Sequence, residues 1–70
     1  MNTQSGELIA RLITTLAGLD LRAERAHDEY KAYYADRAEQ CRKWLFDLRY
    51  GGPVDAGHIA GGLAEFEAIV

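Results

Sequence analysis

The sequence predicts an all-α fold: a helical bundle built on one long central helix with a shorter helix on either side. Residues 19–50 contain no glycine or proline, and apolar and aromatic side chains recur along them at helical spacing. An unbroken helix over that stretch would be roughly 48 Å long, whereas a compact globule of this size should be about 28 Å across. The central helix is therefore expected to extend beyond its own monomer.

The first element expected is a helix over residues 5–17, after a disordered lead at residues 1–4. Ser5 is a suitable N-cap because its hydroxyl can accept a hydrogen bond from a free backbone N–H of the first turn. The apolar residues that follow recur at helical spacing on one face: Leu8, Ile9, Leu12, Ile13 and Leu16.

The path of the chain at Gly18 has two interpretations. The Ala17–Asp20 stretch resembles a glycine helix stop followed by an aspartate N-cap, which favours a separate long helix over residues 20–50. At 100° per residue, however, the apolar residues before and after Gly18 keep one phase, which favours a helix continuous with the first. We favour the break, since uncapped helices beyond about 25 residues are uncommon outside coiled coils.

A final short helix is expected over residues 55–69, after the Gly51–Pro53 stretch ends the long helix. Asp55 is its N-cap, and one face carries Ile59, Leu63, Phe66 and Val70. Three glycines weaken this helix by nearly 1 kcal/mol each relative to alanine, so it must dock on another element. The four-residue spacing of Gly57 and Gly61 is expected to accept aromatic side chains of the long helix.

The small size of the chain favours a homodimer. A single domain of 70 residues is marginally stable alone. Cys41 is the only cysteine, which excludes an intrachain disulfide and is typical of a reducing cytoplasm. We expect long helices to pair at the centre of a dimer, with the antiparallel direction favoured over the parallel one.

The sequence shows no basic, apolar leader and no run long enough to span a membrane, which predicts an unprocessed cytoplasmic protein without a membrane partner. The net charge is −3, and residues 19–50 balance seven acids with seven bases. The excess lies in the tail, which carries Asp55, Glu65 and Glu67 and no base. An acidic chain gains nothing from counterion release, so nucleic acid is not the expected partner.

An aromatic belt on the long helix is the candidate binding surface or dimer seam: Tyr30, Tyr33, Tyr34 and Trp44. Aromatic side chains with a polar tip are enriched where proteins contact partners, although they also pack in cores. Phe46 and Tyr50 lie off this stripe, so they either meet the final helix or remain exposed, and they form a second candidate patch if both are exposed.

Arg37 falls within the apolar phase between Tyr34 and Cys41, where a guanidinium needs a partner. Its head can reach solvent or stack on Tyr33 or Tyr34. The alternatives are an interchain ion pair or a contact with an anionic ligand.

The sequence offers no catalytic residue, no metal site and no cofactor motif, so an enzyme is not expected. Glu24 and His27 have the Glu-x-x-His spacing found in di-iron bundles, but such a site also needs carboxylates from facing helices, and Glu24 lies far from the apolar stripe. His58 is expected in the first turn of the last helix, and Cys41 is expected to be a small core residue.

These observations predict a small non-enzymatic protein–protein interaction module. In length and composition the chain resembles the small accessory proteins that phages and other mobile elements direct against host proteins, which implies an inhibitor or regulator of a larger protein. The acidic residues Glu65 and Glu67 would contact a basic surface of that target. One alternative is a nucleic-acid regulator, either a helical-bundle RNA binder or a helix-turn-helix at residues 17–20 with Arg22, Arg25 and His27 entering the groove. The other is a binder of a small anionic ligand, with Arg37 as its counter-charge.

Overall fold

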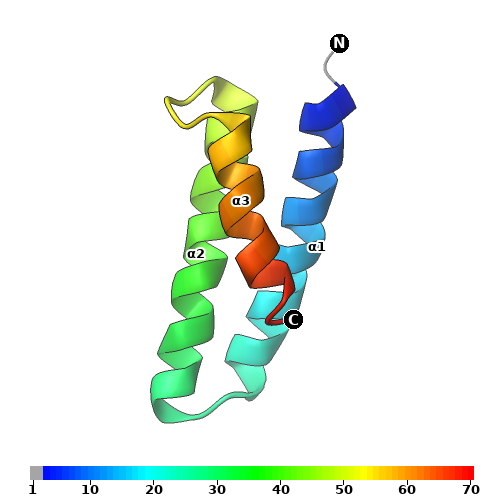
Figure 1. Ribbon diagram of the computed structural model, residues 1–70. Coiled ribbons are helices and arrows are strands. Elements are labelled where there is room, and N and C mark those ends of the chain that lie inside the picture. Colours follow the sequence, from blue (N-terminus) through cyan, green and yellow to red (C-terminus); the bar gives the residue numbers. More distant parts are fainter. Residues whose placement is uncertain (1–2) are drawn as a thin grey trace.

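The computed structural model describes residues 3–70, with side chains from Gly6 onward, and this part of the chain is all-helical (Figure 1). It forms three helices: α1 (Thr3–Arg25), α2 (Asp28–Tyr50) and α3 (Ala56–Glu67). The expected disordered lead lies partly outside the described residues, at Met1 and Asn2. Its other two residues belong to the first turn of α1.

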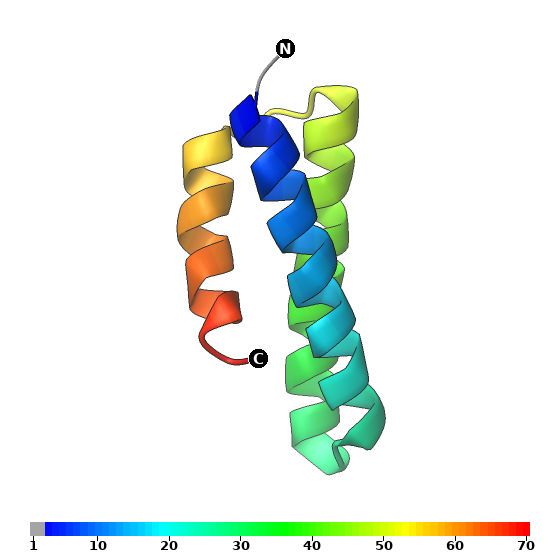
Figure 2. The ribbon, with the colours of Figure 1, turned by 90° about the vertical axis from the view of Figure 1, so that its right-hand side faces the viewer.

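The chain turns at Ala26 and His27, and not at Gly18. Both α1 and α2 are 23 residues long and lie antiparallel as a hairpin, so the long helix over residues 20–50 does not form (Figures 1 and 2). Gly18 lies within α1 because a single glycine costs a helix only about 1 kcal/mol. Folding back allows the apolar faces of both helices to be buried within one chain.

Charge at the helix ends favours a turn at this place. Arg22 and Arg25 lie in the last turn of α1, while Asp28 and Glu29 lie in the first turn of α2. Each pair has the sign that the dipole of its helix end favours. Asp28 has a φ of 55°, a left-handed conformation that aspartate adopts more readily than most residues.

The connection between α2 and α3 is built from glycine and aspartate. Gly51 has a φ of 70°, and the backbone N–H of Gly52 donates to the carbonyl oxygen of Asp47 at 2.8 Å. Asp55 then caps α3, since its carboxylate accepts a hydrogen bond of 2.7 Å from the N–H of Gly57. These contacts give a sharp reversal that returns α3 along the hairpin.

The hydrophobic core contains residues of all three helices. Its buried apolar members are Leu8, Leu12, Leu19, Ala38, Cys41, Trp44, Ile59 and Leu63. Fully burying a leucine or isoleucine side chain contributes about 1.5–3 kcal/mol, so these contacts supply most of the free energy that holds the bundle together.

Gly62, and not the Gly57 and Gly61 pair, accepts an aromatic side chain of α2. A Cβ built at Gly62 would lie 2.5 Å from Cη2 of Trp44, whereas nothing lies within 4 Å of one built at Gly61. Trp44 also stacks on Phe66, with ring centroids 5.4 Å apart. The absence of a side chain at Gly62 thus allows α3 to lie close against the indole.

The molecule is elongated, with extents of 41 × 18 × 16 Å. Figure 2 shows that α3 covers one face of the hairpin and only the half that contains the start of α1 and the end of α2. The other half, which ends at the α1–α2 turn, is two helices thick.

Candidate partner-binding surface

The candidate site is the half of the hairpin that α3 does not cover. The chain end lies against Gly18, where Val70 would be 3.2 Å from an added Cβ. Beyond that contact, a shallow hollow of about 470 Å³ is lined by Gly18, Leu21, Arg22, Arg25, Ala26, Tyr34 and Val70. We call this hollow and the adjoining Tyr33 the hairpin surface.

A second open hollow, of about 430 Å³, lies at the turn itself and is lined by Ala26, His27, Asp28, Glu29, Tyr30 and Tyr34. The two hollows share Ala26 and Tyr34. Tyr34 packs against the core, and its ring meets that of Tyr33 edge to face with centroids 5.3 Å apart. One half-buried tyrosine therefore connects the end of the hairpin with the face below α3.

The structure separates the members of the predicted aromatic belt. Tyr30 is 63% exposed and Tyr33 is 39% exposed, whereas Trp44 is only 6% exposed. Trp44 packs against α3 within the monomer, so it is not available as a partner contact in this fold. The tyrosines near the turn are the accessible part of the belt.

Arg37 stacks on Tyr33. Its Cζ lies 3.5 Å from the ring centroid of Tyr33, and its Nη1 donates a hydrogen bond of 2.9 Å to the carbonyl oxygen of that residue. The guanidinium is thus satisfied within one helix turn. No anionic ligand is needed to explain this arginine.

Glu67 does not project freely from the C-terminal segment. Nη2 of Arg11 lies 2.6 Å from Oε1 of Glu67 and Nε lies 3.1 Å from Oε2, which makes a two-point ion pair between α1 and α3. This hydrogen bonding lowers the pKa of Glu67 and raises that of Arg11. Of the two expected acidic contacts, Glu65 is exposed and Glu67 fastens α3 to α1.

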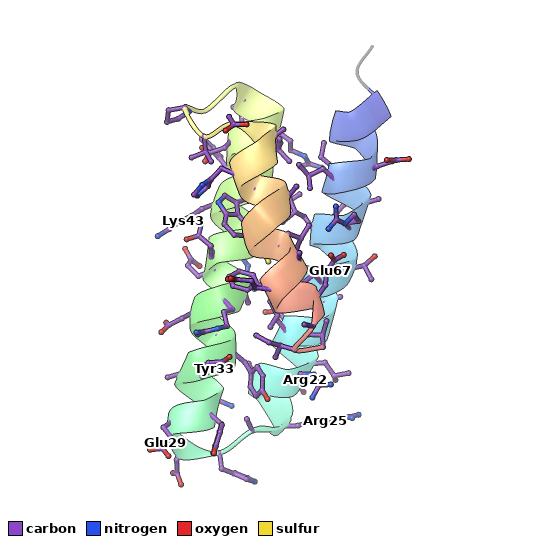
Figure 3. The ribbon with its side chains drawn as sticks, in the orientation of Figure 1. Arg22, Arg25, Glu29, Tyr33, Lys43 and Glu67 are labelled. Atoms are coloured by element: carbon purple, nitrogen blue, oxygen red, sulfur yellow. The ribbon has the colours of Figure 1, made fainter. Side chains whose placement is uncertain are left out.

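Arg22 and Arg25 give the hairpin surface a positive rim. Both are exposed, and within the described residues neither makes an ion pair. Figure 3 shows both side chains on α1 below the end of α3. Leu21, which precedes them on α1, is 46% exposed. An apolar hollow edged by guanidinium groups suits a partner segment that carries both apolar and acidic side chains.

The side chains that could bind a metal ion or react do not form a common site. Glu24 lies in α1 and His27 in the turn, so they do not share a helix. In residues 6–70 no three side chains of the histidine, cysteine, aspartate and glutamate types gather in a geometry suited to a metal ion. Burial raises the pKa of the Cys41 thiol to about 11, which keeps it protonated at neutral pH.

Sequence reasoning did not predict that Leu21, Arg22 and Arg25 line one hollow. It placed the two arginines on a solvated face of a helix that continues to Tyr50, and named them as contacts only for a nucleic-acid binder. The bases Arg22 and Arg25, followed by the consecutive acids Asp28 and Glu29, are the signal that could have located the turn, although Glu24 lies between the two bases. In contrast, Phe46 and Tyr50 are both exposed, as the second candidate patch required.

No protein-family model, curated protein or solved structure that was compared with the chain is significantly similar to it. Among the described helices, none combines the length and the apolar character needed to cross a bilayer.

Proposed function

We propose that this chain is a non-enzymatic protein–protein interaction module whose hairpin surface receives an amphipathic helix from a larger protein. The observation that carries the proposal is that α3 stops halfway along the hairpin and leaves an apolar hollow with an arginine rim. A partner helix with acidic side chains at its edges would continue the layer that α3 begins. By the resemblance to phage and mobile-element accessory proteins, the consequence of binding would be inhibition or regulation of the partner.

The chain offers a matched pair of variants to test this proposal. Leu21 and Ile13 both lie on α1, at 46% and 50% exposure, but only Leu21 lines the hollow. In affinity capture from the native host lysate, wild type and Ile13→Asp should recover the same partner, and Leu21→Asp should not. Circular dichroism of both variants controls for folding. Equal recovery by all three proteins would place binding elsewhere.

The arginine rim supplies a second arm of this experiment. The variant Arg22→Glu with Arg25→Glu should weaken binding to the recovered partner, and the wild-type affinity should fall as salt rises. If Leu21→Asp bound the partner as well as wild type while the affinity still fell as salt rises, the contact would depend on charge alone. That result would contradict binding in the apolar hollow.

Nucleic-acid binding is the alternative, since Arg22 and Arg25 also suit phosphate groups. The turn that a helix-turn-helix would need at residues 17–20 is absent, because α1 is continuous there. A helical-bundle RNA binder would use the exposed face of the hairpin. A gel shift at low salt with duplex DNA and structured RNA tests this class directly.

Homodimerisation is a separate proposal, which the small size and the elongated shape of the chain support. We do not assign the hairpin surface to the dimer contact.

A further inference from the structure

The outer face of α2 carries an exposed aromatic pair. Phe46 is 60% exposed and Tyr50 is 70% exposed, and their ring centroids lie 4.7 Å apart. Both project from the side of α2 opposite Trp44 and Cys41, which are buried. Two adjacent exposed rings on a small protein form a patch that favours a contact with another molecule.

This pair belongs to a longer row along α2. Six positions alternate at spacings of four and three residues, the repeat of a coiled-coil seam: Ala32, Asp36, Glu39, Lys43, Phe46 and Tyr50. All six are exposed. Figure 3 shows Lys43 extending from α2 away from the other two helices. We call this row the outer seam.

We propose that the outer seam binds the outer seam of a second copy of this chain, with the two α2 helices antiparallel. About a two-fold axis at the level of Cys41, Lys43 of each copy faces Glu39 of the other. Tyr50 faces Ala32 of the second copy, so the largest side chain of the seam meets the smallest. Phe46 lies against the Cβ of Asp36 and the neighbouring Ala35.

Charge selects the second copy and its direction. In the antiparallel register the two Glu39–Lys43 contacts are both attractive. Asp36 lies one helix turn from Glu39 on the same seam, so it adds a second negative charge on that side. In a parallel pair Glu39 would face Glu39 and Lys43 would face Lys43, which is repulsive at both positions. The sequence of the seam is thus complementary to itself only when it is reversed.

Both charged groups are available for this contact. Lys43 makes no ion pair within residues 6–70, and Glu39 makes one long ion pair there, with its Oε2 3.8 Å from Nη1 of Arg42. Tyr33 and Arg37 lie on a different side of α2, so the dimer leaves the hairpin surface free. This inference rests on the proposed self-association and not on partner binding, and each can fail without the other.

Charge exchange at the seam tests the proposal by sedimentation equilibrium. Wild type should be dimeric, and Lys43→Glu and Glu39→Lys should each raise the dimer dissociation constant by about tenfold or more, because each replaces two attractions by two repulsions. An equimolar mixture of the two variants should form a heterodimer, since one copy is then basic at both positions and the other acidic. The control Glu65→Lys, on α3, should dimerise like wild type.

If wild type were monomeric at roughly 100 μM, its dimer dissociation constant would exceed that concentration. Such a weak self-affinity would overturn the proposal of a stable dimer. So would single variants that dimerise as well as wild type. Direction is tested with Ala32→Cys and Tyr50→Cys, while Cys41 is buried. When the two variants are mixed and oxidised, a disulfide between residue 32 of one copy and residue 50 of the other should form. Preferential disulfides between two copies of the same variant would overturn the antiparallel register.

Discussion

Gly62 is the residue on which the close approach of α3 to α2 depends. Gly62→Ala should lower the free energy of unfolding by about 1–3 kcal/mol, because the new methyl group would overlap the rigid indole of Trp44. This loss should outweigh the gain of about 1 kcal/mol that alanine brings to a helix. Urea denaturation followed by fluorescence measures it directly, since Trp44 is the only tryptophan.

Gly61→Ala is the matched control. Nothing lies within 4 Å of a Cβ at Gly61, so alanine there should raise the free energy of unfolding by up to about 1 kcal/mol. If both substitutions had the same effect, α3 would not pack through Gly62.

The Arg11–Glu67 pair predicts a pH dependence of stability. Glu67 has a lowered pKa in the folded state, so the pair stabilises the fold at neutral pH and loses that contribution as pH falls through the lowered pKa. The stability difference between wild type and Arg11→Met should therefore shrink between about pH 7 and pH 3. Thermal denaturation across this range is the measurement.

Arg49→Met provides the comparison for that titration. Arg49 is exposed and makes no ion pair within the described residues, so this variant should show no difference that shrinks on acidification. A difference for Arg11→Met that stayed constant to pH 3 would mean that the ion pair does not form in solution.

Single residues were predictable where the chemistry is local. Asp55 as a cap depends only on its neighbours along the chain, and the position of Phe46 and Tyr50 off the apolar stripe follows from their phase on α2. The sequence leaves their exposure open, because it depends on where α3 packs. The contact of Gly62 with Trp44 depends on how α3 is rotated about its axis. That rotation is decided by packing between helices distant in sequence, which no local pattern reports.

At the scale of the elements, the glycines at the two candidate helix ends behave differently. Gly18→Ala should leave the free energy of unfolding unchanged or raise it by up to about 1 kcal/mol, because Gly18 is helical and Val70, its tight neighbour, is exposed and lies outside α3. Gly51→Ala should lower it by about 1 kcal/mol, because the φ of 70° strains any residue with a Cβ. Denaturant titration of the two variants gives both values.

If Gly18→Ala destabilised the protein more than Gly51→Ala did, a helix end at Gly18 would be supported instead.

The sequence predicts the all-helical class and the reversal after Tyr50, since periodicity and the glycine pair are strong local signals. The turn at Ala26 and His27 escaped prediction because it contains neither glycine nor proline. Its determinants are the opposite charges of two helix ends and the apolar surface that α1 and α2 bury against each other when the chain folds back.

At the scale of the whole molecule, the hairpin presents two surfaces with different character. The outer seam carries charges of both signs and two aromatic rings, and suits a reversed copy of itself. The hairpin surface is an apolar hollow edged by Arg22 and Arg25 and suits an acidic amphipathic helix. A dimer joined at the seam would present two hairpin surfaces, so one assembly could engage two partner molecules.

The binding constants of the matched α1 variants for the recovered partner test the central claim most directly. Leu21→Asp should raise the dissociation constant by about tenfold or more, since a carboxylate would enter an apolar hollow that faces acidic side chains. Ile13→Asp should change it by no more than about twofold. Equal effects of the two substitutions, or a larger effect of Ile13→Asp, would contradict the assignment of the hairpin surface as the binding site.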